Sequence, residues 1–221
     1  AITVDPTSSD VKVGYSVVFH PDFIRTYELV KNIGSYSFFD YEVNEALFLS
    51  EKEKQQIRTI GKGILSEYEG TIDSYSQDAI VSHIALLLVY SQRFYDRQFI
   101  TRKAHNIPLV SRFEQLLDEY FDAGTQHTGL PQVGYFAERL NMSKNYLSDL
   151  LRAQTGESAQ NHIQHKIIEK AKNLLSRSQL SVAEIAYQLG FEQPQSLNRL
   201  FKKKTSVSPL EFRRTISFNN L

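Results

Sequence analysis

Apolar residues recur at three- and four-residue spacing in the C-terminal half of the chain, and one such pattern occurs there twice. The recurring residues are Ala137, Leu140, Leu147, Leu150, Leu151, Thr155 and Ser158, and then Ala186, Leu189, Leu197, Leu200, Phe201, Thr205 and Ser208. The first two pairs are 49 residues apart and the others are 50 apart. A repeat of this length indicates one supersecondary unit that is used twice.

Each copy of the pattern predicts a short helix, a tight turn and a longer helix. Asn141 and Gly190 stand at the turns, and these residue types best tolerate a left-handed backbone after a helix. Ser143 is the expected N-cap of the first longer helix, while Ser181 and Glu184 have the spacing of a capping box before the second short helix. This order of elements is that of the helix-turn-helix motif.

The predicted helix-turn-helix units span about 131–155 and 181–205, and further helices surround them. Helical spacing at 158–176 predicts a connecting helix of about 25 Å, which would set a fixed distance between the units. An amphipathic helix is expected at 111–121, and Pro209 starts a last short helix. The polar segment 101–108 ends in proline, so we expect it to be a linker.

The N-terminal half has a different pattern. The strand-like stretches are 11–19 and 45–50, and two or three strands do not form a stable sheet alone. They either pack on the helices that follow or, as we expect, belong with strands upstream of Ala1. Two helices are predicted within 51–101. The second, at 76–100, is apolar on so many sides that it lies in a core or in a subunit interface.

Composition excludes some classes of site and charge suggests a partner. The chain has no cysteine, so it has no disulfide, cysteine metal site or cysteine nucleophile, and this absence fits the reducing cytoplasm. Residues 1–125 have 12 basic and 18 acidic residues (12 − 18 = −6), and residues 126–221 have 13 and 7 (13 − 7 = +6). Unless this division is chance, we expect the basic half to meet a polyanion.

The second helix of a helix-turn-helix unit lies in the major groove, where its N-terminal residues contact base edges. The recognition helices expected here are 143–155 and 194–205. The polar positions outside the apolar stripes are the candidate DNA contacts. They are Lys144, Asn145, Ser148, Asp149 and Arg152 in the first unit, and Gln193, Gln195, Ser196, Asn198, Arg199, Lys202 and Lys203 in the second. Arginine pairs well with guanine, asparagine and glutamine with adenine, and lysines neutralise phosphates.

The register of the repeat places Asp149 where the second unit has Arg199. A carboxylate repels phosphate and only accepts hydrogen bonds, for example from cytosine N4. The first unit is therefore expected to bind more weakly or to read a cytosine, unless Asp149 forms an intrahelical pair with Arg152. In the second unit, we expect Lys204, Arg213 and Arg214 to join the lysines that neutralise phosphates.

A long ordered series of residues runs through both units. It comprises Ala137, Leu140, Ser143, Tyr146-Leu147, Thr155-Gly156-Glu157-Ser158, Ala171, Leu174-Leu175, Leu180-Ser181, Glu184-Ile185-Ala186, Leu189-Gly190-Phe191, Phe201-Lys202-Lys203, Ser208-Pro209 and Phe212-Arg213. With this series, the chain from 111 to 214 resembles the DNA-binding domain of the AraC/XylS family of transcription regulators. The resemblance implies a mainly α protein with a seven-helix domain at 109–217, whose two recognition helices enter successive major grooves. The chain departs from the family at Ser206, where glycine is frequent.

Upstream of this domain the resemblance is weaker. It is to the end of a cupin-like regulatory domain followed by dimerisation helices. The resemblance implies a small α+β region at 1–104, with incomplete cupin-like strands at 1–50 and helices at 51–101. It also implies a homodimer formed through the helix at 76–100.

These features predict a sequence-specific DNA-binding transcription regulator, and specifically an activator, with double-stranded DNA as its partner. RNA polymerase and an unidentified small-molecule effector are further candidate partners. No cofactor, metal site, membrane contact or enzymatic activity is expected, because the chain has no nucleophile elbow, phosphate loop or metal-ligand pattern of histidines. The alternative is a helical protein-interaction module without specific DNA binding.

Overall fold

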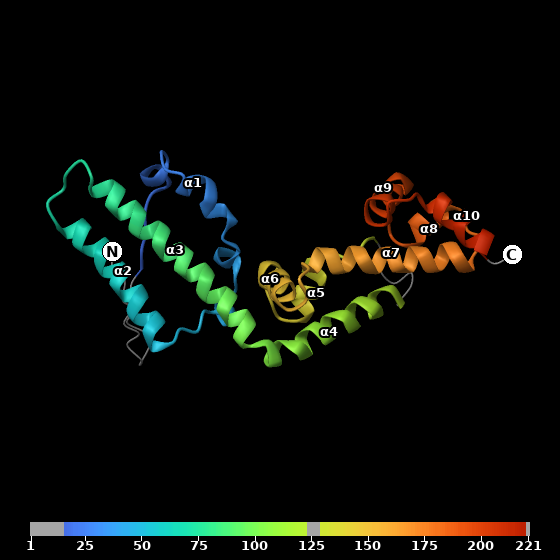
Figure 1. Cartoon of the computed structure of the whole chain (residues 1–221), viewed down its shortest axis with the longest axis horizontal. Helices are drawn as coiled ribbons and strands as arrows, with labels where there is room; N and C mark the ends of the chain where they lie inside the picture. The colour runs from blue at the N-terminus through green and yellow to red at the C-terminus, as the bar shows by residue number, and fades with distance from the viewer. Residues whose placement is uncertain (1–15, 123–128, 220–221) are drawn as a thin grey trace. The chain divides into compact units, whose positions relative to one another are not determined.

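A computed structural model describes residues 16–122 and 129–219, and these residues divide into two compact units (Figure 1). The first unit takes the chain up to residue 39 and residues 46–98, and the second takes residues 40–45 and the chain from 99 onwards. The helices are α1 Leu29–Asn32, α2 Glu51–Glu69, α3 Ser76–Thr101, α4 Lys103–Asp122, α5 Val133–Arg139, α6 Lys144–Thr155, α7 Ala159–Arg177, α8 Val182–Gln188, α9 Pro194–Thr205 and α10 Pro209–Asn219. Within these described ranges, no helix is long and apolar enough to cross a membrane.

The first unit is organised around α3. Val81, Ile84 and Leu88 of α3 form one buried cluster with Ile24 and Leu29 from the preceding turns. Short 3-10 helices at Pro21–Ile24, Ile33–Ser35 and Ser37–Asp40 hold further aromatic and aliphatic side chains against this cluster. One face of α3 therefore packs in a core. Burial in a core was one of the two interpretations of its apolar pattern, and a subunit interface was the other.

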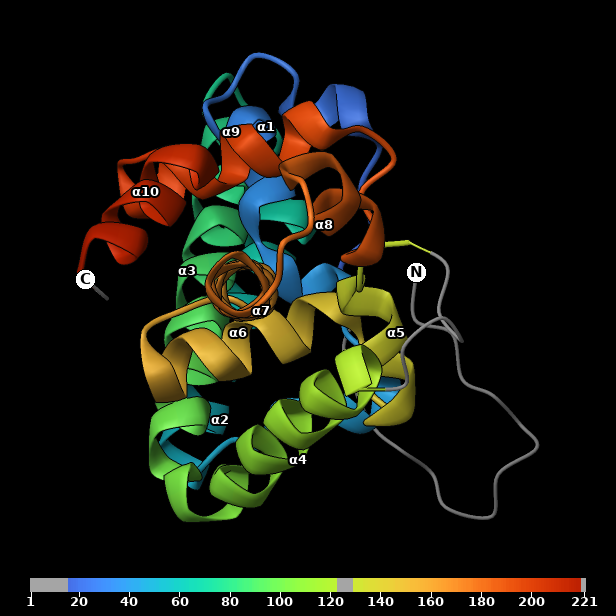
Figure 2. The same ribbon diagram turned by 90° about the vertical axis from the view of Figure 1, so that its right-hand side faces the viewer.

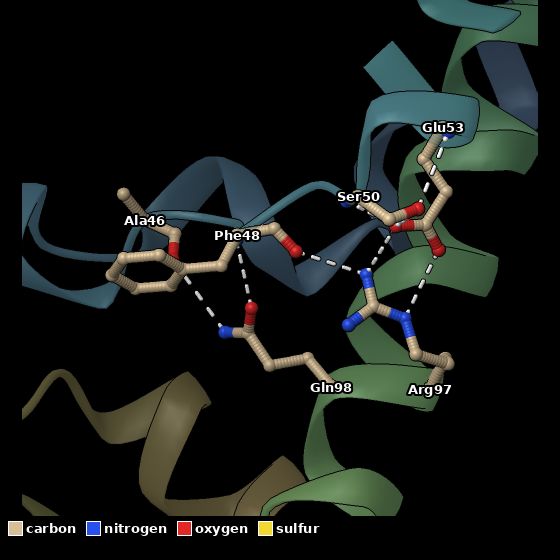
Figure 3. A network of polar contacts seen from close by, with 6 residues as sticks. All are labelled: Ala46, Phe48, Ser50, Glu53, Arg97 and Gln98. Carbon is tan, nitrogen blue, oxygen red and sulfur yellow. Dashed lines mark hydrogen bonds and ion pairs between the residues drawn. The ribbon is translucent and has the colours of Figure 1, made fainter.

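The strands expected in the N-terminal half are absent from the described residues. Residues 46–50 are irregular, residues 16–20 are irregular as well, and residues 11–15 lie outside the described ranges. At the expected strand 45–50, the buried side chain of Gln98 accepts a hydrogen bond from the Phe48 amide at 2.8 Å and donates to the Ala46 carbonyl at 3.5 Å (Figure 3). An amide side chain thus bonds two alternate backbone groups as a neighbouring strand would. The α+β expectation for residues 1–104 is wrong for the described part, which is helical.

The beginning of α2 is held to α3 by a charged network. Ser50 and Glu53 form a capping box, and the guanidinium of Arg97 donates to both carboxylate oxygens of Glu53 at 3.0 and 2.8 Å (Figure 3). Arg97 also donates to the carbonyl of Phe48 at 2.9 Å. Burial raises the pKa of Glu53, but hydrogen bonds from Ser50 and the charge of Arg97 lower it by more, so the net shift is downward.

The segment expected to be a linker is helical. The helix α4 begins at Lys103, immediately after α3 ends, and continues through Pro108. The buried side chain of Asn106 donates to the carbonyl of Phe99 at 3.3 Å, which satisfies one backbone acceptor near the end of α3. The apolar stripe that follows, with Phe113 and Leu117 buried in the core of the second unit, stabilises α4 despite the proline.

The described part of the second unit has seven helices, α4 to α10, and the repeat is visible in their bounds. The short helices α5 and α8 begin 49 residues apart, and the longer helices α6 and α9 begin 50 apart. In Figure 2, α7 is seen end-on between α6 on one side and α8 and α9 on the other. The same backbone bond closes both turns, from Met142 to Ala137 and from Phe191 to Ala186, each at 2.9 Å.

The apolar stripes predicted for the second unit are buried, apart from the partly buried Leu200, and Leu147, Leu151, Leu197 and Phe201 belong to one core. Leu147, Leu150 and Leu151 of α6 and Leu197 and Phe201 of α9 are each 0% exposed. The buried residues of α7 are Ala159, Ile163, Ile167, Ile168, Ala171 and Leu175.

Both turn residues have the left-handed backbone that was expected, with φ of 53° at Asn141 and 91° at Gly190. A left-handed residue also ends each recognition helix, with φ of 85° at Gly156 after α6 and 65° at Ser206 after α9. Ser206 is thus one of two non-glycine residues with positive φ among the described residues.

Candidate nucleic-acid interface

The second recognition helix, α9, presents a polar face that is open to solvent. Pro194 is its first residue and has no amide hydrogen, and Gln193 stands at the N-cap without a side-chain cap. Leu197 and Phe201 face the core and Leu200 packs against it, whereas Asn198 and Arg199 between them are exposed. All seven candidate DNA contacts of this unit are exposed, namely Gln193, Gln195, Ser196, Asn198, Arg199, Lys202 and Lys203.

None of these seven side chains has a hydrogen bond or ion pair with another group in the described part of the chain. The face therefore offers a guanidinium, three carboxamides, one hydroxyl and two ammonium groups with unused hydrogen-bonding capacity. Carboxamides and a guanidinium are the groups that make paired contacts to adenine and guanine in the major groove. Two lysines in the last turn of α9 add positive charge suited to phosphates.

Two other basic residues of this unit have structural partners. The half-buried Arg213 donates to the carbonyls of Leu175 and Leu180, at 3.2 and 2.7 Å, and so ties α10 to the end of α7. Lys204 lies 3.1 Å from a ring nitrogen of His165. Arg213 and Lys204 thus have intramolecular partners, whereas Arg214 is exposed, and a phosphate contact by any of the three stays a prediction.

The first recognition helix, α6, is less open. Lys144 and Arg152 are exposed, but Asn145, Ser148 and Asp149 are only partly accessible. The predicted intrahelical pair is present, because Arg152 donates directly to the Asp149 carboxylate.

A short acidic segment contacts the beginning of α6. The Glu45 carboxylate accepts hydrogen bonds from the amide and the hydroxyl of Ser143, both at 2.6 Å. Asn145 donates to the carboxylate of Asp40 at 2.7 Å. The hydroxyl of Tyr41 donates to Asp149 at 2.7 Å.

The sequence pattern does not predict this contact. Its one local sign is the density of negative charge, because Asp40, Glu42 and Glu45 lie within six residues. The contact itself joins residues about 100 positions apart, which no periodicity along the chain reveals.

The helix α7 separates the two recognition helices within the second unit. Its 19 residues correspond to about 28 Å, and successive major grooves on one side of a duplex lie about 34 Å apart. Both ends of α7 are fixed by the shared core. The two histidines on it have local partners, since His162 lies 2.8 Å from the Thr155 hydroxyl and His165 pairs with Glu157 at 3.0 Å.

Comparison with known proteins gives a match over the same region. A family model described as a helix-turn-helix domain matches residues 136–215, which include both repeated units. The chain is 30% identical over 95 residues to the Msm operon regulatory protein of Streptococcus mutans, covering 43% of this chain and 34% of that protein. It is 28% identical over 157 residues to the arabinose operon regulatory protein of Salmonella typhimurium, covering 67% of this chain and 52% of that protein.

The chain thus spans about half or less of the length of these curated relatives. Among solved structures, the C-terminal domain of AraT, a response regulator from Geobacillus stearothermophilus, is 31% identical with a TM-score of 0.44. That match covers 49% of this chain and 85% of the other chain.

Proposed function

We propose that residues 136–215, which match a family model described as a helix-turn-helix domain, are an AraC/XylS-type domain and that the protein is a sequence-specific DNA-binding transcription regulator. The observation that carries the proposal is the exposed polar face of α9. Its amide, hydroxyl and guanidinium groups match the hydrogen-bonding pattern of base edges. The proposed role is binding and requires no catalytic group.

In this proposal, α6 and α9 are the two recognition helices and enter successive major grooves of one duplex. The rigid packing of both helices on α7 supports a fixed spacing between the two contacts. Arg199 and Asn198 read bases, while Lys202 and Lys203 contact phosphates. The contacts of the first unit are made by Lys144, Asn145, Ser148, Asp149 and Arg152.

We also propose that the protein is a homodimer formed through α3. One face of α3 belongs to the core of the first unit, but Leu86 and Val89 are 43% and 53% exposed on the same helix. Apolar side chains on a free helical face support association with a second copy. Dimerisation would pair two DNA-binding units and so lengthen the DNA site.

The remaining parts of the proposal concern regulation. The names of the relatives, an Msm operon regulatory protein and an arabinose operon regulatory protein, support control of transcription. Activation, contact with RNA polymerase and response to a small-molecule effector belong to the same proposal and rest on this likeness alone.

The test is a binding selection from a pool of random duplexes, followed by sequencing of the bound fraction. Fluorescence anisotropy at several salt concentrations accompanies it, because each phosphate contact makes the affinity more dependent on salt. We expect a steep negative salt slope and an enriched motif of two blocks, about 10 base pairs apart. The block read by α9 should be the sharper one.

Two other outcomes separate the alternatives. A steep slope without an enriched motif would mean that binding is basic and non-specific, and it would contradict the proposed base reading by α9. No binding even at low salt would contradict DNA binding altogether and favour the protein-interaction module.

A further inference from the structure

We propose that Asp40–Glu45 is an autoinhibitory clamp, an internal anion that occupies the first recognition helix and must leave before that helix contacts DNA. The inference rests on the proposed function and adds its regulation. The clamp is a six-residue excursion of the chain, because residues 40–45 belong to the second unit while the residues on both sides belong to the first.

The strongest element of the clamp is Glu45. Its side chain is 5% exposed, and its carboxylate holds both the amide and the hydroxyl of Ser143, the N-cap of α6. The positive end of a helix is where proteins bind phosphates, through backbone amides and hydroxyl groups. A buried carboxylate on these donors takes the place that a phosphate of the DNA backbone would take next to the first recognition helix.

Asn44 donates to the carbonyl of Asn141 at 3.4 Å, and two further contacts of the clamp engage side chains that are candidates for base reading. Asp40 accepts from the carboxamide of Asn145, a group that would otherwise pair with adenine. Tyr41 donates to one carboxylate oxygen of Asp149, while Arg152 donates to the other. The oxygen that Tyr41 occupies would otherwise accept from cytosine N4. The ring of Tyr41 also packs edge-on against Tyr146, with 5.1 Å between centroids, which orders the clamp on α6.

The clamp and DNA therefore compete for the same donors and acceptors. A protein whose binding-competent state is only partly populated has its apparent affinity reduced by that fraction. The seven candidate DNA contacts of the second unit are exposed, and no acidic segment contacts them among the described residues. In the clamped state the protein would read one block through α9, and in the open state it would read two.

A pair of alanine variants tests the clamp. Glu45→Ala removes the carboxylate that holds Ser143, and Glu42→Ala removes an equal charge from an exposed neighbour whose side chain has no partner among the described residues. Both are compared with the parent protein on the two-block duplex from the selection, by anisotropy and by hydroxyl-radical footprinting. We expect Glu45→Ala to raise the affinity by roughly tenfold and to extend protection over the block of the first unit. Glu42→Ala should leave the footprint of the parent unchanged.

A second measurement does not depend on removing Glu45. The chain has no cysteine, so Val43→Cys, at a position 94% exposed within the clamp, takes a single spin label. We expect the electron paramagnetic resonance spectrum of the label to sharpen when the two-block duplex is added, as the clamp leaves α6. A single-block duplex read by α9 alone should leave the spectrum unchanged.

Other results would overturn the clamp. Equal gains for Glu45→Ala and Glu42→Ala would mean that only net charge matters. An unchanged footprint for Glu45→Ala, or an unchanged spectrum on DNA whose two blocks are both protected, would mean that the segment does not cover the DNA face. In these cases the parent still protects the α9 block, so the proposed function stands. If neither parent nor variant binds DNA, the proposed function itself fails and the clamp with it.

Discussion

The two helix-turn-helix units share one backbone plan but differ in what their recognition helices present. The face of α9 carries seven exposed polar side chains without partners in the described chain, whereas α6 meets the acidic segment 40–45 at its N-terminus. The buried apolar residues of the two helices occupy equivalent positions in the repeat, with Leu147 and Leu151 corresponding to Leu197 and Phe201. Core positions thus repeat because both helices pack on α7, while surface positions are free to diverge in charge and in partners.

The difference extends to how each helix is capped. Ser143 caps α6 through its hydroxyl and is in turn held by Glu45, while Gln193 provides no side-chain cap to α9. The amides of Ser143 and Tyr146 thus have side-chain acceptors at the first helix, whereas no side chain caps the second. In the proposed clamp mechanism, this contrast makes the first unit the regulated one.

The largest effect is expected from exchanging the turn residue of one unit for that of the other. Gly190→Asn places in the second turn the residue that the first turn has at Asn141. A Cβ at Gly190 would lie 2.3 Å from the backbone oxygen of Gly129. Because backbone atoms must move, we expect a loss of about 3 kcal/mol in the free energy of unfolding, measured by urea denaturation.

The matched control is Asn141→Gly, which puts the residue of the second turn into the first. Glycine adopts the left-handed backbone without steric cost but is more flexible when unfolded, so we expect a change below about 1 kcal/mol. Similar losses for the two variants would show that the turns are not distinguished by the contact with Gly129.

The next prediction concerns base reading by α9. Arg199→Ala should cost about 1–3 kcal/mol of binding free energy at one base pair and relax specificity at that position. Lys203→Ala, on the same exposed face, should weaken binding to all sequences about equally and reduce the salt slope by about one. Anisotropy titrations on the selected duplex and on single-base variants of it measure both effects. If Arg199→Ala changed neither specific nor random binding, α9 would not be the base-reading helix.

The second unit was the most predictable part from the sequence. Helical periodicity is a local property, so the repeat of Leu147 and Leu151 at Leu197 and Phe201 was enough to predict both recognition helices and their buried stripes. Residue type alone predicted the left-handed turn at Gly190. The exposed face of α9 followed by exclusion, since the residues outside the stripe point to solvent.

What the sequence did not reveal depends on distant partners. Residues 45–50 have strand-like composition, yet the backbone there is bonded by Gln98, about 50 residues away. Residues 40–45 contact α6 within the second unit by hydrogen bonds that no pattern within either segment encodes. Arg213 was expected on DNA because it is basic, but two carbonyls near the end of α7 fix it. The local sequence pattern predicts secondary-structure elements. The hydrogen-bond partners of long polar side chains become known only from the fold.

A smaller effect is expected where the recognition helices end. Gly156 and Ser206 are equivalent in the repeat, and both have left-handed backbone. Ser206→Gly should stabilise the protein by about 1 kcal/mol, because a left-handed backbone strains a residue that has a Cβ. The reverse change, Gly156→Ser, should destabilise it by about as much, since no atom lies within 4 Å of the added Cβ and only backbone strain acts. Thermal unfolding of the two single variants and of the double variant Gly156→Ser/Ser206→Gly measures both changes in stability.

The smallest effect is a pH dependence confined to the second unit. The short helix α8 begins with a capping box in which Ser181 and Glu184 bond each other, whereas the equivalent helix α5 has Gln132 at its N-cap and no side-chain cap. The backbone amide of Ser181, and then its hydroxyl, donate to the carboxylate and lower the pKa of Glu184. A carboxylate whose pKa is lower in the folded state stabilises the fold at pH values above its unfolded-state pKa of about 4.3. This stabilisation is lost as the pH falls through the folded-state pKa.

We therefore expect Glu184→Gln to reduce stability slightly at neutral pH and to flatten the loss of stability below about pH 5. Glu192→Gln is the matched control, because Glu192 is exposed and has no hydrogen bond within the described ranges. Urea midpoints measured from neutral to acidic pH should separate the two variants. Parallel curves for both would mean that the capping box contributes no pH dependence and that the two short helices are equivalent in acid despite their different first residues.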